Sequence, residues 1–324
     1  MEGQFRIDAN RRTLFVGLVC VDILNLLPKY PEEDIGHRCI DYYKQRGGNA
    51  SNSSTVFSLL GGNAEFFGTL ADDTELSFIQ RDFEKFGVIF KNSIIISEKT
   101  CPLSIVILSL ESHTRTVLHT NKDLPELTLD GFVKNINLNS SEYGWIHFEG
   151  RDNAHEIARM LSYIKEFNKV NEIHIFTSLE AEKLRIAPYL DELDMWKLPD
   201  IMFVSKDFAR NQGYTSMEQA VTSYYKKVKT GAVVICAWGE MGAAAMSDQS
   251  GLVTSPAFPP SEILDTCGAG DTFIGATLFA LGQGKALQKA IEYGCKVAGS
   301  KCGVQGFQNL TLLKDVFSQF QLSS

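Results

Sequence analysis

The sequence of 324 residues is long enough for one large domain or two ordinary ones. Hydrophobic residues make up 44% and charged residues 22%, so a large core is possible, and no long segment has the composition of a disordered chain. The net charge of −8, without a dense cluster of Lys and Arg, argues against binding to nucleic acid or to an anionic membrane.

Several sequence features favour a cytoplasmic protein. No apolar run approaches the roughly 18–20 residues needed to span a bilayer, and the N-terminus is polar where a signal peptide would be apolar. The seven cysteines are odd in number and form no CxxC pair. We therefore expect buried free thiols rather than disulfides or zinc ligands.

Five apolar segments are expected to form central strands of a mostly parallel sheet, because they lack the alternation that a solvent-facing side would impose. In chain order they span 14–21, 144–150, 172–176, 201–204 and 232–238. Segments with helical spacing of apolar residues span 50–61, 77–87, 154–167, 216–228, 271–284 and 285–303. The alternation predicts a layered α/β fold, and its continuity without a linker predicts one domain over 1–324. Two further segments have the alternation of apolar and polar residues that favours short strands, and they predict a small accessory sheet. They span 22–46 and 100–121.

The segment DTCGAGDTF at 265–273 is the strongest candidate for chemistry. Gly268, Ala269 and Gly270 would let the backbone approach a ligand, and the following helix would aim its first N–H groups at an anion. Asp271, in the first turn, could accept a proton from a hydroxyl that attacks a phosphoryl group. A tight loop with Asp271 as a helix cap is the alternative. The segment lacks the Lys of a Walker A loop, and Phe273 replaces the last glycine of a Rossmann GxGxxG motif.

A second group of polar residues lies near the N-terminus. Asp22 directly follows the first apolar segment, and ligands of open α/β sheets bind beyond the carboxyl ends of strands. Gly47 and Gly48 precede a predicted helix on which Asn49 and Asn52 share a face. One carboxylate and two amides suit the hydroxyls of a sugar. The alternative is that both asparagines are helix caps.

These residues belong to a wider pattern that resembles the ribokinase-like (phosphofructokinase-B) family of sugar kinases. The matching phrases extend over nearly the whole chain: GLVCVDIL, RGGNASNS, RTVLH, WIHFEGR, FVSKD, GAVVICAWGEMGA, FPP, DTCGAGDTF and KCGVQGF. WIHFEGR and KCGVQGF narrow the match to the branch that phosphorylates the 1-hydroxyl of fructose. The resemblance implies a three-layer α/β/α sandwich with a mostly parallel central sheet and a β-lid formed by about 22–46 and 100–121.

The resemblance also implies a role for each matching position. Asp271 would be the general base, beside an anion hole lined by Gly268, Ala269 and Gly270. The residues expected to hold fructose with Asp271 are Asp22, Gly48, Asn49 and Asn52. Arg115 would reach the transferring phosphate, although a lone arginine on a strand is more often an exposed surface charge. The residues expected near the nucleotide are Gly239, Glu240, Gly242, Phe258, Pro259, Pro260 and Cys295, with Gly268 and Gly270.

The implied substrates and cofactors are a ketose, ATP and Mg²⁺, with K⁺ as an option. Many relatives carry an Asn-x-x-Glu motif where this chain has FVSKDFA, so the protein ligands of Mg²⁺ stay unknown. Glu180 and Glu182 are candidates, with a solvated loop as the alternative reading of that segment. The lid implies a homodimer and would exclude water from the reaction.

Two other functions stay open from the sequence. One is another sugar or nucleoside kinase of the same family, acting on ribose, a sugar acid or adenosine. The other is a catalytically inactive regulator that binds a sugar or nucleotide. Asp271, the GAGD phrase and Arg115 argue against the inactive regulator, since all three are intact.

Overall fold

A computed structural model describes residues 3–112, 114–140 and 142–313. Its largest sheet has eight strands in the order β14-β13-β12-β11-β10-β9-β1-β4. Their bounds are β1 Arg12–Val16, β4 Ala64–Phe67, β9 Tyr143–Glu149, β10 Phe176–Ala181, β11 Ile201–Ser205, β12 Val233–Ala237, β13 Ala243–Ser247 and β14 Gly251–Ser255. Six neighbouring strands of this sheet, β4, β1, β9, β10, β11 and β12, pair in parallel. Strands β13 and β14 extend the sheet beyond β12 with antiparallel pairing.

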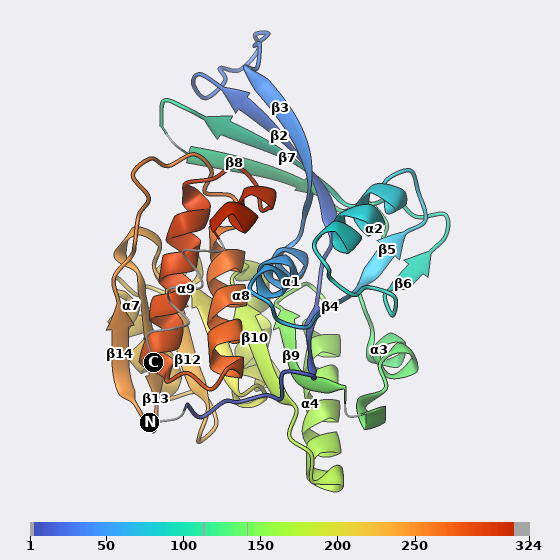
Figure 1. Ribbon diagram of the computed structural model, residues 1–324, viewed down its shortest axis with the longest axis vertical. Coiled ribbons are helices and arrows are strands. Elements are labelled where there is room, and N and C mark those ends of the chain that lie inside the picture. The colour runs from blue at the N-terminus through green and yellow to red at the C-terminus, as the bar shows by residue number, and fades with distance from the viewer. Residues whose placement is uncertain (1–2, 113, 141, 314–324) are drawn as a thin grey trace.

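Helices cover both faces of this sheet, which confirms the predicted three-layer sandwich (Figure 1). One face is covered by α1 (Asn49–Leu59), α2 (Leu76–Lys85), α8 (Ala269–Gly282) and α9 (Leu287–Cys302). The other is covered by α3 (Leu129–Asn135), α4 (Ala154–Asn171), α5 (Ala187–Glu192), α6 (Lys206–Asn211) and α7 (Met217–Tyr225). Strand side chains alternate between the two cores: Phe15 packs in the first, and Leu14 and Val16 in the second. Apolar side chains on both faces explain why these strands are apolar throughout.

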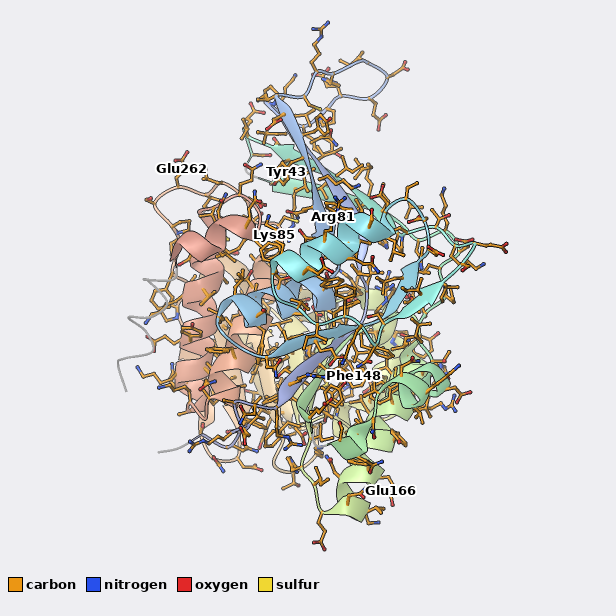
Figure 2. All side chains as sticks on the ribbon, turned by 45° about the vertical axis from the view of Figure 1, so that its right-hand side comes forward. Tyr43, Arg81, Lys85, Phe148, Glu166 and Glu262 are labelled. Atoms are coloured by element: carbon orange, nitrogen blue, oxygen red, sulfur yellow. The ribbon has the colours of Figure 1, made fainter. Side chains whose placement is uncertain are left out.

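A separate four-stranded sheet, called here the small sheet, extends from one end of the sandwich (Figure 1). Its order is β3 (Asp41–Gly47), β2 (Cys20–Leu27), β7 (Leu103–Ser109) and β8 (Thr114–Thr120). The predicted accessory sheet is thereby confirmed. In Figure 2, Tyr43 of the small sheet and Glu262 of the segment before α8 lie at the same end of the molecule, and Glu166 of α4 lies at the opposite end.

The remaining elements are short. Strands β5 (Thr69–Ala71) and β6 (Ile94–Ile96) pair in parallel with each other. The 3₁₀ helices are η1 (Leu138–Ser140), η2 (Leu184–Ile186), η3 (Met195–Lys197), η4 (Gly239–Met241) and η5 (Gln308–Leu313).

Two predicted strands were wrong in their bounds. The segment 14–21 is not one strand, because β1 ends at Val16 and β2 begins at Cys20 in the other sheet. Gly17 lies at the break, where a side chain would fall 2.7 Å from the Glu149 Cβ and 2.8 Å from the Ala50 Cβ. Asp22 therefore lies within β2 of the small sheet and does not follow a strand of the main sheet.

The predicted strand at 172–176 was displaced by several residues. Helix α4 continues to Asn171 and ends at Glu172, which has a positive φ of 53°, and β10 begins only at Phe176. Apolar residues before the strand and polar residues such as Ser178 and Glu180 within it misled the prediction. Both of these polar side chains are buried.

The structure bears on the cysteines and on membrane-spanning segments. All seven cysteines are free thiols and five of them are buried, as predicted. Across the described ranges, we find no helix whose length and apolar character would let it cross a bilayer.

Candidate active site

The candidate site lies where strands β1, β9 and β10 end and helices α1 and α8 begin. Asn52 of α1 donates a hydrogen bond of 2.8 Å from Nδ2 to Oδ2 of Asp271 in α8. The two helices pack closely because Gly275 has no side chain, and a Cβ there would lie 2.6 Å from the Ser53 carbonyl oxygen. The close packing brings together two residues that the sequence analysis assigned to the sugar and to the base.

Asp271 is buried, with 8% of its surface exposed. Burial raises the pKa of its carboxyl to about 8, and the charges of Glu182 and Glu149 act in the same direction. The hydrogen bond from Asn52 and the charge of Lys183 oppose the rise in pKa. A carboxyl with a pKa near the working pH can accept a proton and release it again, as a general base must.

The start of α8 presents free backbone amides. Gly268 is the N-cap with φ 76°, and a Cβ there would lie 2.5 Å from the Phe307 ring. In the described part of the chain, the amides of Gly270 and Asp271 have no acceptor, and no heavy atom lies within 4 Å of a Cβ position at Gly270. Free amides, open space and the helix dipole together suit an anion.

A buried ion pair, which the sequence analysis missed, holds this loop in place. The Asp265 carboxylate accepts hydrogen bonds from Cys267 N (2.8 Å), Lys301 Nζ (2.6 Å) and Gly306 N (3.0 Å). Lys301 is fully buried and Asp265 nearly so. The sequence feature that could have indicated this ion pair is Lys301 on an otherwise apolar helix face, because an ammonium group is buried only with a partner.

Of the residues predicted to hold a sugar, Asn52 contacts Asp271 directly, and the others lie around the start of α1. The Asp22 carboxylate covers Gly47, where any side chain would collide with it. Gly48 has φ 98° and precedes α1, which carries Asn49 and Asn52. Burial raises the pKa of Asp22, and hydrogen bonds from Ser104 and Cys20 oppose the rise. The Oδ1 atom of Asn52 is buried and has no partner among the described residues, so it is available to a ligand.

Asn49 connects this group to the two candidate metal ligands. Its Nδ2 atom donates to Glu180 Oε1 at 2.9 Å and also to Glu182 Oε2. Glu180 is buried in β10, so the solvated-loop alternative was wrong for this residue. Within the described ranges, Glu180 Oε2 is buried without a hydrogen-bond partner.

The two glutamates have opposite pKa shifts. Burial raises the pKa of Glu180 well above its usual value, and the charges of Glu182 and Asp271 add to the rise. Burial alone would also raise the pKa of Glu182, but the adjacent Lys183 ammonium, 2.8 Å away, lowers it below its usual value. The directions of the two shifts therefore favour the charged form of Glu182 and the neutral form of Glu180.

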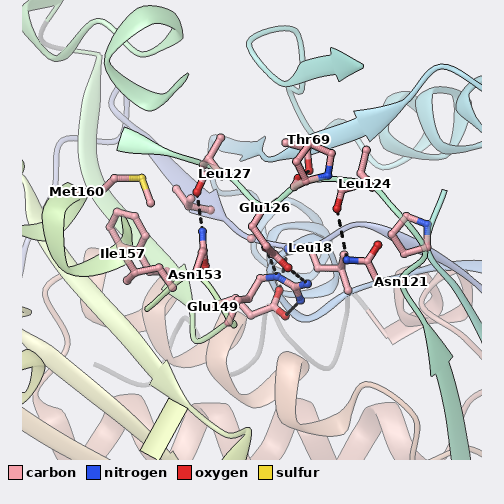
Figure 3. A pocket seen from close by; sticks show the side chains of 16 residues that line it. Leu18, Thr69, Asn121, Leu124, Glu126, Leu127, Glu149, Asn153, Ile157 and Met160 are labelled. Carbon is pink, nitrogen blue, oxygen red and sulfur yellow. Dashed lines mark hydrogen bonds and ion pairs between the residues drawn. The ribbon is translucent and has the colours of Figure 1, made fainter. Parts of the chain in front are cut away.

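Glu149 and Arg151 of the WIHFEGR phrase are further buried residues at this edge that the sequence analysis did not assign. Glu149 Oε2 accepts hydrogen bonds from Leu18 N (2.9 Å) and Ala50 N (3.1 Å), and its Oε1 pairs with Arg151 Nη1 at 3.0 Å. Arg151 also pairs with Glu126, in the segment that follows the small sheet (Figure 3). The sequence feature that could have indicated this role is a charged residue, Glu149, at the end of an apolar strand.

Arg115 lies on β8 of the small sheet and contacts the loop before α8. Its Nη1 atom donates to the backbone oxygen (3.2 Å) and to the Oγ1 atom (3.0 Å) of Thr266. Arg115 is exposed, as the alternative reading expected, and it contacts the loop that precedes the amides at the start of α8.

The residues predicted near the nucleotide form a continuous region beside α9. A side chain at Gly242 would collide with the Ser255 carbonyl, and one at Gly299 with the Phe258 carbonyl. Burial raises the pKa of the Cys295 thiol to about 11, and a hydrogen bond with Ser255 opposes the rise. These contacts bring together η4, the segment after β14, and α9.

Four further nucleotide candidates occupy the rim of this region. Glu240 is exposed and pairs with Lys206 at 2.6 Å, and Gly239 has a positive φ of 58°. Pro260 lies against Gly303, where a Cβ would fall 2.9 Å from the proline Cβ, and Pro259 is exposed.

Comparison with known proteins identifies the family. The model of the pfkB family carbohydrate kinases matches residues 12–314. The chain belongs to this family. It is 39% identical to the ketohexokinase of Mus musculus over 302 residues, which cover 93% of this chain and 99% of that protein. It is therefore an ATP-dependent sugar kinase.

Solved structures support the fold. A ribokinase from Giardia lamblia aligns with a TM-score of 0.76 and 16% identity, over 96% of this chain and 99% of that chain. A ribokinase from Cryptococcus neoformans in complex with ADP aligns with a TM-score of 0.73 and 18% identity, over 95% and 99%. The chain therefore has the ribokinase-like fold.

Proposed function

We propose that this kinase phosphorylates the 1-hydroxyl of D-fructose with ATP, giving fructose 1-phosphate. The observation that carries the proposal is the buried Asp271, which is hydrogen bonded to Asn52 and stands beside the free amides at the start of α8. The choice of sugar is supported by the 39% identity to the ketohexokinase of Mus musculus.

In the proposed mechanism, Asp271 accepts the proton of the 1-hydroxyl while that oxygen attacks the γ-phosphorus of ATP. The new bond joins the sugar oxygen to phosphorus, the bond to the β,γ-bridging oxygen breaks, and ADP leaves with that electron pair. The amides of Gly270 and Asp271 stabilise negative charge on the transferring group, and Gly268 and Ala269 shape the loop. Arg115 adds charged donors from the small sheet.

The sugar is held, in this proposal, by Asp22, Asn52 and the backbone at Gly48, with Asn49 oriented by its two glutamate partners. The nucleotide occupies the region beside α9, between η4 and the Phe258–Pro260 segment. The small sheet acts as a lid that excludes water, so that the phosphoryl group passes to the sugar.

The donor set fits Mg²⁺. Glu180 has a buried oxygen without a partner in the described residues, and Glu182 lies beside it. No three His, Cys, Asp or Glu side chains of the described ranges form a metal-binding group, so phosphate and water oxygens would complete the octahedral set that Mg²⁺ prefers. When bound, Mg²⁺ supplies positive charge to the phosphates.

K⁺ remains only an option. Beside the anion hole, both carboxylate oxygens of Asp265 already accept hydrogen bonds, and Lys301 supplies the positive charge. We derive no step through K⁺.

The partner we propose is a second copy of the chain, bound through the outer face of the small sheet. This face carries half-buried Ile23, Ile105 and Ile107 together with exposed Tyr42 and Leu118, which the strand register places side by side. An apolar surface across four strands is unfavourable in water and suits association. Light scattering should report a dimer in the native protein and a monomer after Leu118→Glu. A native monomer at micromolar concentration would contradict this assembly.

The cysteine content favours a cytoplasmic location. All seven cysteines are free, and thiols persist in reducing compartments. Fractionation of cells should place the protein with cytosolic markers, and recovery from a secreted fraction would contradict this location.

A coupled assay of ADP release with fructose, ribose and adenosine tests the function. We expect the highest kcat/KM with fructose, and NMR of the product should place phosphate on carbon 1. Preference for ribose or adenosine would make the chain another kinase of the family. Calorimetric binding of fructose without ADP release would support the inactive regulator.

A further inference from the structure

A row of polar side chains crosses the base of the small sheet. In the strand register, Asp22 of β2 lies opposite Gln45 of β3 and Ser104 of β7, and Ser104 lies opposite His119 of β8. Residues directly opposite one another in neighbouring strands share a face, so all four side chains emerge on one side of the sheet.

This side of the small sheet faces the candidate site. Two residues further along β2 and β7 on the same face, Leu24 and Val106 pack against Cys267 of the loop before α8. Arg115 shares the face with His119 on β8 and contacts Thr266 of the same loop. The polar row is therefore the part of this face that borders the proposed sugar position.

The contacts within the row orient His119. The Ser104 hydroxyl and the Nδ1 atom of His119 form a hydrogen bond of 3.1 Å. Cys20 donates from Sγ to Asp22 Oδ1 at 3.4 Å and lies 3.8 Å from the Ser104 hydroxyl, so the two ends of the row are connected through short side chains.

The row spans three strands. Strands in a sheet are about 4.8 Å apart, so the backbones at Asp22 and His119 are separated by roughly 10 Å. Ser104, the shortest of the three side chains, lies between them. Asp22 and Ser104 are buried, whereas His119 is exposed, and its Nε2 atom has no hydrogen-bond partner in the part of the chain that is described.

The surroundings of His119 favour the neutral imidazole. Although the residue as a whole is exposed, partial desolvation of the ring lowers its pKa, and the charges of Arg151 and Arg185 lower it further, while Asp22 and Glu149 act in the opposite direction. Because the Ser104 hydroxyl donates to Asp22, its oxygen accepts from Nδ1–H of His119, and the unprotonated Nε2 atom of the neutral ring can accept a hydrogen bond from a hydroxyl.

We propose that His119, oriented by Ser104, is a specificity-determining residue whose Nε2 atom hydrogen bonds to a ring hydroxyl of the ketose bound at Asp22. The residue selects among ketoses that differ in the orientation of that hydroxyl. This inference rests on the proposed function, because it takes the substrate to be a ketohexose.

The test uses D-fructose and three sugars that each differ from it at one stereocentre: D-psicose at carbon 3, D-tagatose at carbon 4 and L-sorbose at carbon 5. The variants are His119→Phe, which keeps a ring without a hydrogen-bonding nitrogen, and His119→Gln, whose amide oxygen can accept a hydrogen bond near the Nε2 position. Thr120→Val is the matched control, because this neighbouring side chain lies on the opposite face of β8.

We expect His119→Phe to reduce the preference for fructose over one of the three epimers about 5–10-fold, the usual effect of one hydrogen bond. The preferences over the other two epimers should change less than twofold. His119→Gln should restore most of the lost preference, and Thr120→Val should keep all of it. Preferences that stay within twofold for every epimer, or an equal loss on all four sugars, would overturn the proposal.

Calorimetric affinities of the same four sugars provide a second readout that needs no turnover. The affinity ratios should change at the same epimer as the kinetic ratios. If the native protein phosphorylates none of the four ketoses, the proposed function fails. If it phosphorylates them and the variants leave the epimer ratios unchanged, only the role of His119 fails.

Discussion

Replacement of Asp271 by Asn tests the proposed chemistry most directly. The substitution removes the proton acceptor but keeps the side-chain shape, and the new amide oxygen can still accept the hydrogen bond from Asn52. We expect kcat to fall at least ~10²-fold, the usual contribution of a general base. Fructose affinity measured by calorimetry should stay within a few-fold, because Asp22 and Asn52 are unchanged.

The pH profile gives a second measurement on the same variant. Because the pKa of Asp271 is about 8 in the free enzyme, the ionised fraction falls about tenfold for each pH unit below that value. The kcat/KM of the native enzyme should decrease accordingly towards acid pH, and the residual activity of Asp271→Asn should lose this dependence.

Stability should change in the opposite direction to activity. The pKa of Asp271 is raised from 3.8 to about 8 on folding, so the folded protein binds one proton more than the unfolded chain between these values, and stability falls as pH rises through this range. At pH 7 the Asn variant avoids this cost. We expect a gain of at least about 1 kcal/mol, since each pKa unit corresponds to about 1.36 kcal/mol, and a rise in Tm of roughly 2–4 °C.

The control for these measurements is Asp130→Asn, which changes an exposed aspartate in the first turn of α3. It should leave kcat and the pH profile unchanged.

A value of kcat for Asp271→Asn within a few-fold of the native enzyme would remove Asp271 from the mechanism. A stability difference between native and variant that is independent of pH would refute the electrostatic argument.

Three further substitutions test other parts of the site. Arg115→Ala should impair nucleotide-dependent turnover more than fructose affinity, because the arginine contacts Thr266 at the anion hole; calorimetry showing the reverse would reassign it. Glu180→Gln should raise the Mg²⁺ concentration for half-maximal activity about tenfold, and an unchanged Mg²⁺ titration would exclude Glu180 as a ligand. Lys301→Met leaves the Asp265 carboxylate buried without its ion-pair partner and should cost about 3–5 kcal/mol of unfolding free energy. A loss below about 1 kcal/mol in a denaturant titration would show that the pair does not stabilise the loop.

The fold could be predicted from the sequence where pattern and burial agree. Strands β9, β11 and β12 are apolar on both faces, and the bounds of the main helices differ from prediction by only a few residues. The hydrophobic pattern did not predict the end of β1, because the chain stays apolar where it passes from the main sheet to the small sheet. Residues on both sides of Gly17 are buried, in β1 and β2, so hydrophobicity does not mark the boundary. The pattern also failed at β10, because the strand carries the buried polar side chains of the site.

The site could be predicted where its residues are neighbours in sequence, as in 265–271 and 47–52. The contacts between these groups could not, since Asn52 and Asp271 are 219 positions apart and Asn49 and Glu180 are 131 apart. Spacing along a strand or helix carries no information on such pairs, which depend on how α1, α8 and β10 pack. The same limit applies to Lys301 and Asp265, whose pairing requires α9 to end beside the loop.

The four carboxyl groups around the site differ in whether they have a cationic partner, and this difference links the proposed base Asp271 to the candidate metal ligand Glu180. Glu149 is paired with Arg151, and Glu182 with Lys183. Asp271 has a neutral donor, and Glu180 keeps one buried oxygen without a partner among the described residues. The two carboxyl groups without a cationic partner, Asp271 and Glu180, are therefore the ones whose pKa values are raised. A phosphate would be attracted by the amides, and a cation that binds with it would lower the pKa of Asp271 and favour the ionised form that accepts a proton.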